Sequence, residues 1–146
     1  MGKITIHWEL LVAATPEVVW DYTQDWRRRR DWDGSVAAVE IIQESPPQRV
    51  RARFGGGLWF DVAYKKGDRP RITTLTMTNS TSAWVTGGGG SWRYEDVGGA
   101  TRWSQSNTLV LRDHFLMRAV SPMLKMMLGF TTRRAMRKAK RILEAR

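Results

Sequence analysis

Apolar and polar side chains alternate over residues 3 to 12. Successive side chains of a strand point to opposite faces, so this alternation predicts a half-buried β-strand. The polar side of the strand begins with Lys3 and Thr5. The apolar side carries Ile4, Ile6, Trp8, Leu10 and Val12.

Two short helices are predicted after this strand. Thr15 and Pro16 are a typical N-cap and first helical residue. Asp25 is suited to cap a second helix, which Gly34 would end after Trp32. The apolar face of the first helix would hold Val18, Val19 and Tyr22.

The middle of the chain reads as six further strands separated by Gly, Pro, Asn and Asp turns. Short connections favour an antiparallel meander, which gives a seven-stranded sheet with the first strand included. One face of this sheet needs a cover. The predicted strands are 36–42, 49–54, 58–66, 71–79, 83–96 and 100–113.

The C-terminal segment is predicted to supply that cover as one long helix. Ser121 before Pro122 is typical of a helix start, so the helix would run from there to about Ala145. Residues 114–120 would form a separate turn or lid, and Gly129 would allow a bend. Residues 123–130 are apolar on nearly every side, which indicates burial on more than one face.

Charge and composition narrow the possible chemistry. The 33 residues from His114 to Arg146 hold nine basic residues and one acidic residue, so they carry +8 of the formal net charge of +10. The absence of cysteine excludes disulfides and thiolate metal sites, and the two histidines lack metal-ligand spacing, so we expect no metal and no cofactor. No signal-peptide or membrane-spanning pattern is present, and we expect a soluble cytoplasmic protein.

The order of elements and three local patterns resemble the START-like, helix-grip (SRPBCC) superfamily, in particular its polyketide cyclase/dehydrase-like and lipid-transport branch. The patterns are ATPEVVWDYTQDWRRRRDWDGSVAAVE, SWRYEDVGGATRWS and the final SPMLKMM…KAKRILEAR. The resemblance implies an α+β helix-grip fold in which residues 1–146 form one ligand-binding domain. It also implies a deep, mostly apolar cavity between a curved sheet and the last helix, which would hold a hydrophobic small molecule. It does not imply catalysis.

Alternation along the late strands suggests which residues line that cavity. Gln105 and Asn107 would face it together with Trp103, where their amides would bind a ligand oxygen or pair with neighbouring groups. The four glycines at 87–90 would form a bulge that admits a ligand or the helix, or a flexible hairpin tip. The expected ligand-binding residues are Trp32, Trp84, Trp92, Tyr94, Trp103, Gln105, Asn107, Met123, Met127, Phe130 and Arg134.

Candidates for catalysis are few. Asp61 is expected to point to solvent, because it alternates with the apolar residues of its strand. Tyr64, Tyr94 and Asn107 remain as weak candidates, able to orient a carbonyl or an enolate but poor at proton transfer. Two function classes stay open: a binding or carrier protein, and an aromatase/cyclase-like enzyme acting on a polyketide-type substrate.

Three basic clusters are best interpreted as solvated surface charge, with binding to RNA or an anionic membrane as the alternative. Arg134 follows Met127 and Phe130 at helical spacing, so it would either pair with a ligand carboxylate or phosphate or extend to the rim of the cavity. The chain would act as a monomer or a homodimer. The clusters are Arg27–Arg30, the row Arg49, Arg51 and Arg53, and Arg133, Arg134, Arg137, Lys138, Lys140 and Arg141.

Overall fold

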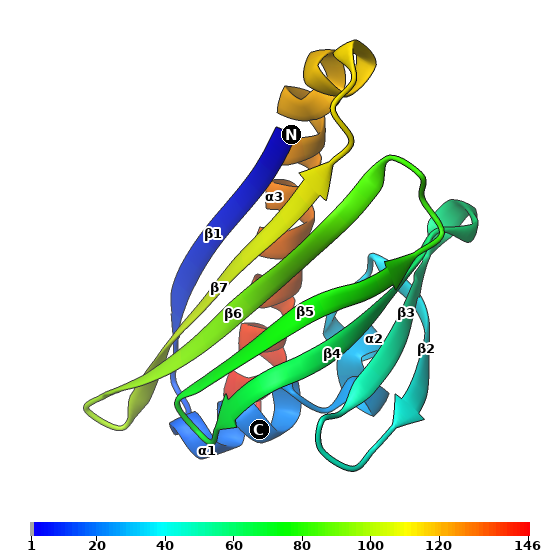
Figure 1. Cartoon of the computed structure of the whole chain (residues 1–146). Helices are drawn as coiled ribbons and strands as arrows, with labels where there is room; N and C mark the ends of the chain where they lie inside the picture. The colour runs from blue at the N-terminus through cyan, green and yellow to red at the C-terminus, as the bar shows by residue number, and fades with distance from the viewer. Residues whose placement is uncertain (1) are drawn as a thin grey trace.

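The computed structural model describes residues 2–146 and contains one seven-stranded antiparallel sheet in the order β1-β7-β6-β5-β4-β3-β2 (Figure 1). The first strand therefore closes back beside the last, and β1 and β2 form the two edges. The strands are β1 (Gly2–Val12), β2 (Val36–Gln43), β3 (Arg49–Phe54), β4 (Trp59–Asp68), β5 (Ile72–Ser80), β6 (Val85–Val97) and β7 (Ala100–Leu111). The helices are α1 (Pro16–Thr23), η1 (Trp26–Arg28), α2 (Arg29–Trp32), η2 (Gly55–Gly57) and α3 (Phe115–Glu144).

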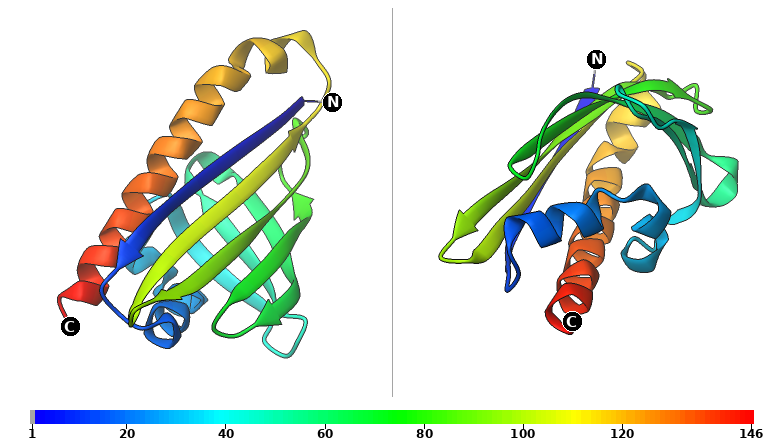
Figure 2. Two further views of the ribbon diagram at one scale, coloured as in Figure 1. Left: turned by 90° about the vertical axis from the view of Figure 1, so that its left-hand side faces the viewer. Right: turned by 90° about the horizontal axis from the view of Figure 1, so that it is seen from below.

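The sheet curves around α3, which lies across its concave side and packs on β1 and α2 (Figure 2). This arrangement confirms the predicted α+β helix-grip fold, with two short helical segments after the first strand. We call the concave side the inner face. No described helix is both long enough and apolar enough to cross a membrane.

The short helices form largely as their sequence predicts. The Asp25 carboxylate accepts a hydrogen bond from the Arg27 backbone N–H at 3.0 Å, so it caps the second helical segment. In α1, Val19 and Tyr22 are buried, but Val18 is 41% exposed, so its place on the apolar face was wrong. Eight residues give barely two turns, and only one side of such a helix reaches the core.

The predicted start of the long helix was also wrong, because α3 begins at Phe115 and residues 115–120 are its first turns. His114 caps the helix, since its Nδ1 accepts a hydrogen bond from the Leu116 N–H at 3.1 Å. Pro122 lies inside the helix and cannot donate to the Arg118 carbonyl. The Ser121 hydroxyl donates to that carbonyl instead, at 3.2 Å, which lets the helix continue.

Candidate functional site

The inner face has two zones that differ in packing. Around the second half of α3, aromatic rings from α2, β6 and β7 fill the space with Met136 into one buried cluster. A second, smaller cluster joins η1 to β3 and β4. The predicted residues Trp32, Trp92, Tyr94, Trp103 and Gln105 are all buried on this face.

Around the second cluster the inner face is only half covered. Phe54 and Phe60 meet edge to face, with ring centroids 5.4 Å apart, and both stay half-buried. Met77 and Leu109 from neighbouring strands come together above Gly88 and are also half-buried. A partly exposed apolar surface therefore extends over β3, β4, β5 and β7.

The Tyr94 hydroxyl is fully used inside the protein. Gln24 Nε2 donates to it at 2.7 Å, and Thr23 Oγ1 lies at 2.7 Å. Because Thr23 spends its own proton on the Val19 carbonyl, Tyr94 must be the donor to Thr23. Burial raises the pKa of Tyr94 strongly, so the phenol stays protonated. Its hydroxyl serves the packing of α1 against β6 and has no proton left for a ligand.

Tyr64 differs in this respect. Its oxygen accepts a hydrogen bond from Trp26 Nε1 at 2.6 Å, while its own proton has no acceptor among the described residues. Burial raises the pKa of Tyr64 to about 12, and the nearby charge of Arg29 opposes that effect only in part. At neutral pH Tyr64 is thus a protonated phenol, and its O–H is available to donate a hydrogen bond.

Arg29 places a positive charge in the interior. Its Nε donates to Asp33 Oδ2 at 2.9 Å, and only 13% of its side chain is exposed. The Cζ atom lies 4.8, 4.5 and 4.7 Å from the ring centroids of Trp26, Trp32 and Trp92, within cation–π range. The assignment of Arg29 to solvated surface charge was therefore wrong.

The spacing of Trp26, Arg29 and Trp32 contains a signal that points to this arrangement. Residues three apart in a helix lie on the same side, so this spacing predicts that Arg29 lies between the two tryptophans. A run of four arginines hides this pattern. Its other members are exposed, and Arg27 and Arg28 form ion pairs with Glu44 and Asp25.

The two predicted amides pair with each other. Asn107 Nδ2 donates to Gln105 Oε1 at 3.1 Å, and Asn107 Oδ1 faces Trp92 Nε1 at 3.4 Å. Gly90 makes room for this group, because a Cβ at position 90 would fall on Asn107 Oδ1. The glycines at 87–90 lie within β6 and are not a hairpin tip; they admit Asn107 and neighbouring strand backbone.

Five predicted cavity residues lie elsewhere. Trp84 is in the turn before β6, where it packs edge to face on His114, and a register shift between Val85 and Gly87 separates it from the strand's inner side. The other four are exposed on the side of α3 opposite its buried residues, so the expectation that they face the sheet was wrong. They are Met123, Met127, Phe130 and Arg134.

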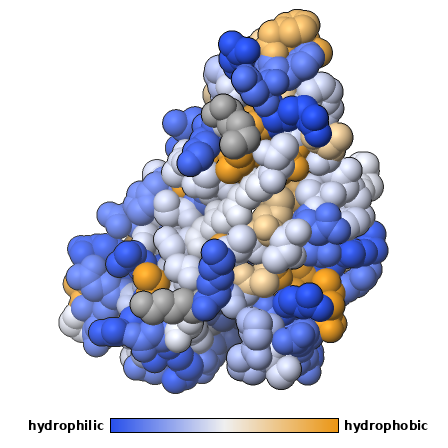
Figure 3. All heavy atoms as spheres, in the orientation of Figure 1, coloured by the Kyte–Doolittle hydropathy of each residue, from blue (hydrophilic) through white to orange (hydrophobic). Residues whose placement is uncertain are grey.

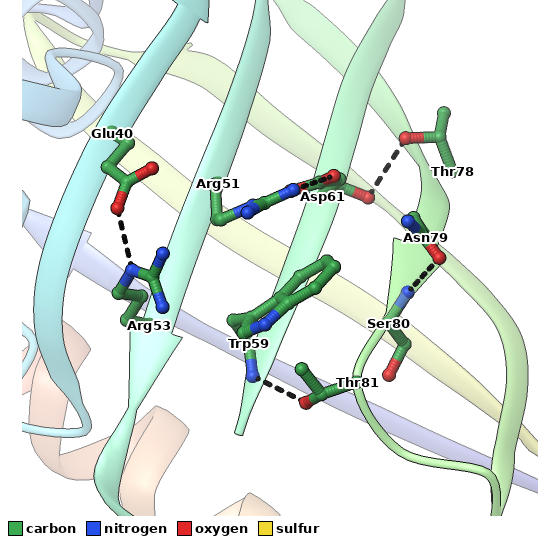
Figure 4. A network of polar contacts seen from close by, with 9 residues as sticks. All are labelled: Glu40, Arg51, Arg53, Trp59, Asp61, Thr78, Asn79, Ser80 and Thr81. Carbon is green, nitrogen blue, oxygen red and sulfur yellow. Dashed lines mark hydrogen bonds and ion pairs between the residues drawn. The ribbon is translucent and has the colours of Figure 1, made fainter. Parts of the chain in front are cut away.

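Asp61 lies on the outer face of the sheet but does not point freely to solvent. Arg51 binds it through two hydrogen bonds of 2.7 and 3.0 Å, and Trp59 stacks on the guanidinium with its ring centroid 3.8 Å from Cζ (Figure 4). These two side chains cover the carboxylate, and the residue is only 9% exposed. This group ties β3 to β4 on the side away from Tyr64.

Two grooves lie outside the aromatic interior. One, of about 520 Å³, runs between the free edge of β1 and α3 and is lined by residues such as Trp8, Met126 and Arg133. The other, of about 820 Å³, lies near the β4–β5 turn and is lined by charged residues such as Glu9, Arg93 and Arg102. Among residues 2–146, no cluster of three His, Asp or Glu side chains is arranged to hold a metal.

Comparison with known proteins gives one family. The family described as polyketide cyclase / dehydrase and lipid transport matches residues 3–146. No curated protein sequence matches the chain.

Solved structures agree in fold at low sequence identity. The Zhui aromatase/cyclase from Streptomyces sp. R1128 has a TM-score of 0.83 at 18% identity, over 98% of this chain and 94% of that one. A protein from Thermus thermophilus has a TM-score of 0.82 at 14% identity, over 97% of both chains. A START superfamily protein from Mycobacterium smegmatis has a TM-score of 0.79 at 14% identity, over 97% of this chain and 98% of that one.

Proposed function

The chain belongs to the polyketide cyclase/dehydrase and lipid-transport family, and from this premise we propose that it binds a hydrophobic small molecule against the inner face of its sheet. One observation carries the proposal: the half-covered apolar surface lies on the same face as the buried charge of Arg29 and the available O–H donor of Tyr64. Ligand sites typically combine apolar walls with a few placed polar groups.

The chemistry of these two groups favours an aromatic or lipid-like molecule that carries an oxygen acceptor. The Tyr64 phenol can donate to a carbonyl, and the guanidinium of Arg29 suits a carboxylate or an enolate. Phe54 and Phe60, which are half-buried, offer ring faces and edges for an aromatic ligand. The bond between Gln105 and Asn107 uses one N–H of Asn107 and one lone pair of Gln105 Oε1, so the Gln105 Nε2 amide can still donate to a ligand oxygen.

A second candidate function is an aromatase/cyclase-like enzyme. The observation that favours it is that Trp26 contacts both groups: its Nε1 donates to the Tyr64 oxygen at 2.6 Å, and its ring centroid lies 4.8 Å from Arg29 Cζ. A cation and a phenol together stabilise the negative oxygen that forms when a carbonyl compound enolises. Asp33, the carboxylate beside Arg29, is held by Arg29 and Ser35. Such an enzyme would work by folding and polarising its substrate, with little acid–base assistance.

The binding proposal is tested with two probes that share one ring system, 2-naphthoate and the neutral ketone 2-acetylnaphthalene, by quenching of tryptophan fluorescence. We expect both to bind. The variant Tyr64→Phe should weaken both about fivefold, the value of one net hydrogen bond. Native mass spectrometry of freshly purified protein adds a search for a co-purified molecule.

Tyr94→Phe is the matched control, because it deletes the same atom from a tyrosine whose hydroxyl is internally satisfied. It should lower stability and leave the affinity for both probes unchanged. Failure of both probes to bind, together with the absence of any co-purified molecule, would reject the proposal. Equal loss of affinity in the two variants would reject the role given to Tyr64.

A further inference from the structure

One exposed stripe runs along nearly the whole outer side of α3. Steps of three and four residues place its members on one side of the helix, opposite the buried Gly129, Met136 and Ala139. Every member is exposed. We call this set the outer stripe; it consists of Leu116, Ala119, Met123, Met127, Phe130, Arg134, Arg137 and Arg141.

The first half of the outer stripe is apolar to a degree that a solvated helix does not need. Met127 is 55% exposed and Phe130 is 59% exposed, and Phe115 and Met126 beside the stripe are 69% and 67% exposed. Figure 3 shows hydrophobic surface at the tip of the molecule, over the first turns of α3 that project beyond the strands. Isolated exposed apolar residues are ordinary, but a contiguous patch marks an interaction surface.

The second half of the outer stripe is purely cationic. Arg134, Arg137 and Arg141 form no ion pair with any described residue, whereas many arginines elsewhere do, such as Arg51, Arg53 and Arg69. Arg137 has only a cation–π contact with Trp8, at 5.8 Å. These unpaired charges continue the line of the apolar side chains.

Charge decides between the occupants that could cover the outer stripe. A second copy packed in parallel would place arginines against arginines, and an antiparallel copy would bury arginines against methionine and phenylalanine. Both arrangements leave charges unpaired at an interface, which is costly. Nucleic acid would neutralise the arginines, and an unpaired base could stack on Phe130, but Met123 and Met127 would stay uncovered. An anionic lipid bilayer satisfies both halves.

We propose that the outer stripe docks on an anionic membrane surface. The helix lies in the plane of the bilayer, with its apolar half among the acyl chains near the headgroups and its arginines on lipid phosphates. From Leu116 to Arg141 the stripe is about 38 Å long at 1.5 Å per residue, so several headgroups lie within reach. This surface is separate from the inner face, and its role does not depend on the ligand proposed there.

A single fluorescent label reports the docking, because the chain has no cysteine of its own. Met127→Cys, labelled with an environment-sensitive nitrobenzoxadiazole, is mixed with phosphatidylcholine vesicles that contain about 30% phosphatidylglycerol. We expect a blue shift and a brighter signal, which weaken as salt rises from roughly 50 to 500 mM. Vesicles of phosphatidylcholine alone should give little response. Ile42→Cys on β2, 44% exposed in the native chain, is the matched label and should not respond.

Charge variants distinguish the effect of the arginines in the outer stripe from the effect of the total charge of the protein. Arg134→Ser, Arg137→Ser and Arg141→Ser together should lower vesicle affinity about 100-fold, since each arginine near an anionic surface contributes roughly fivefold. The control replaces three other exposed arginines by serine, Arg30, Arg49 and Arg93, and should change affinity no more than about threefold through long-range charge alone. Both triple variants change surface residues only, so thermal unfolding should confirm that both fold.

Four results would overturn the proposal. The first is no vesicle binding at low salt, and the second is an equal loss of vesicle affinity in the two triple variants. The third is a fluorescence response of the label at position 42 that matches the response at position 127. The fourth is a fluorescence response at position 127 that depends on protein concentration without vesicles. The last of these would identify a second copy as the occupant. Binding to RNA that survives Met127→Asp and Phe130→Asp, with no vesicle binding, would assign the arginines to nucleic acid.

Discussion

Replacement of Arg29 by methionine removes the buried cation and tests how the aromatic interior is held together. The change leaves Asp33, which is 6% exposed, with only the Ser35 N–H and hydroxyl as partners, at 3.1 and 2.6 Å. Loss of one member of a buried ion pair costs roughly 3–5 kcal/mol. The two Ser35 bonds soften the loss, while the three cation–π contacts add to it. We therefore expect a loss of about 3 kcal/mol in the free energy of unfolding.

The assay is urea unfolding followed by tryptophan fluorescence, with thermal unfolding beside it. A loss of about 3 kcal/mol should lower Tm by roughly 6–12 °C in a chain of this size. The double variant Arg29→Met, Asp33→Asn removes both charges, so most of the lost stability should return. Arg53→Met is the surface control, because both Arg53 and Glu40 are well exposed, and it should cost no more than about 0.5 kcal/mol.

Two results would refute this reasoning. A cost below about 1 kcal/mol for Arg29→Met would mean that Asp33 is not stranded in a region of low polarity. A double variant no more stable than the single one would mean that the guanidinium acts through packing and not through its charge. If the double variant is stable, it becomes the protein in which to measure 2-naphthoate binding without Arg29, and we expect that binding to be weaker.

Two further predictions follow from the inner face. Gly90→Ala should cost about 1–3 kcal/mol through overlap with the Asn107 amide, and the added variant Asn107→Ala should remove most of that cost; equal costs in both backgrounds would contradict the steric account. Burial raises the pKa of all three tyrosines, to about 12 for Tyr64, so the native state holds these protons more tightly than the unfolded chain. The contribution of these tyrosines to the free energy of unfolding should therefore be full below about pH 10 and should be lost as pH rises above it. The absorbance of tyrosinate at positions 64 and 94 should appear only when the protein unfolds.

Strand positions could be predicted because both alternation and turn chemistry act locally. The alternation of β1 and β7 assigned Trp103 and Gln105 correctly to the inner side. Alternation fails where register slips, as it did for Trp84, since a bulge reverses every side chain beyond it. The glycines that permit the bulge were visible, but not the number of residues it absorbs.

Helix α3 defeated prediction for a different reason. A segment that is apolar on all sides gives no information on which side is buried, so Met127 and Phe130 were assigned to the wrong face. The Ser121 and Pro122 pair resembles a helix start, and only the hydroxyl bond to the Arg118 carbonyl reveals it as an interior turn. Local spacing could place Arg29 between Trp26 and Trp32, but its contact with Trp92 is a tertiary contact that no local pattern encodes.

The uneven packing of the inner face assigns fold stability to one set of residues and the exposed apolar surface to another. Trp32, Trp103 and Met136 anchor one end of the molecule, while Phe60, Met77 and Leu109 border the half-covered surface at a distance from that anchor along the strands. Under the proposed function, changes in the second group would alter which ligand the surface binds without weakening the first group. A library aimed at new ligands should therefore vary β4 and β5 first.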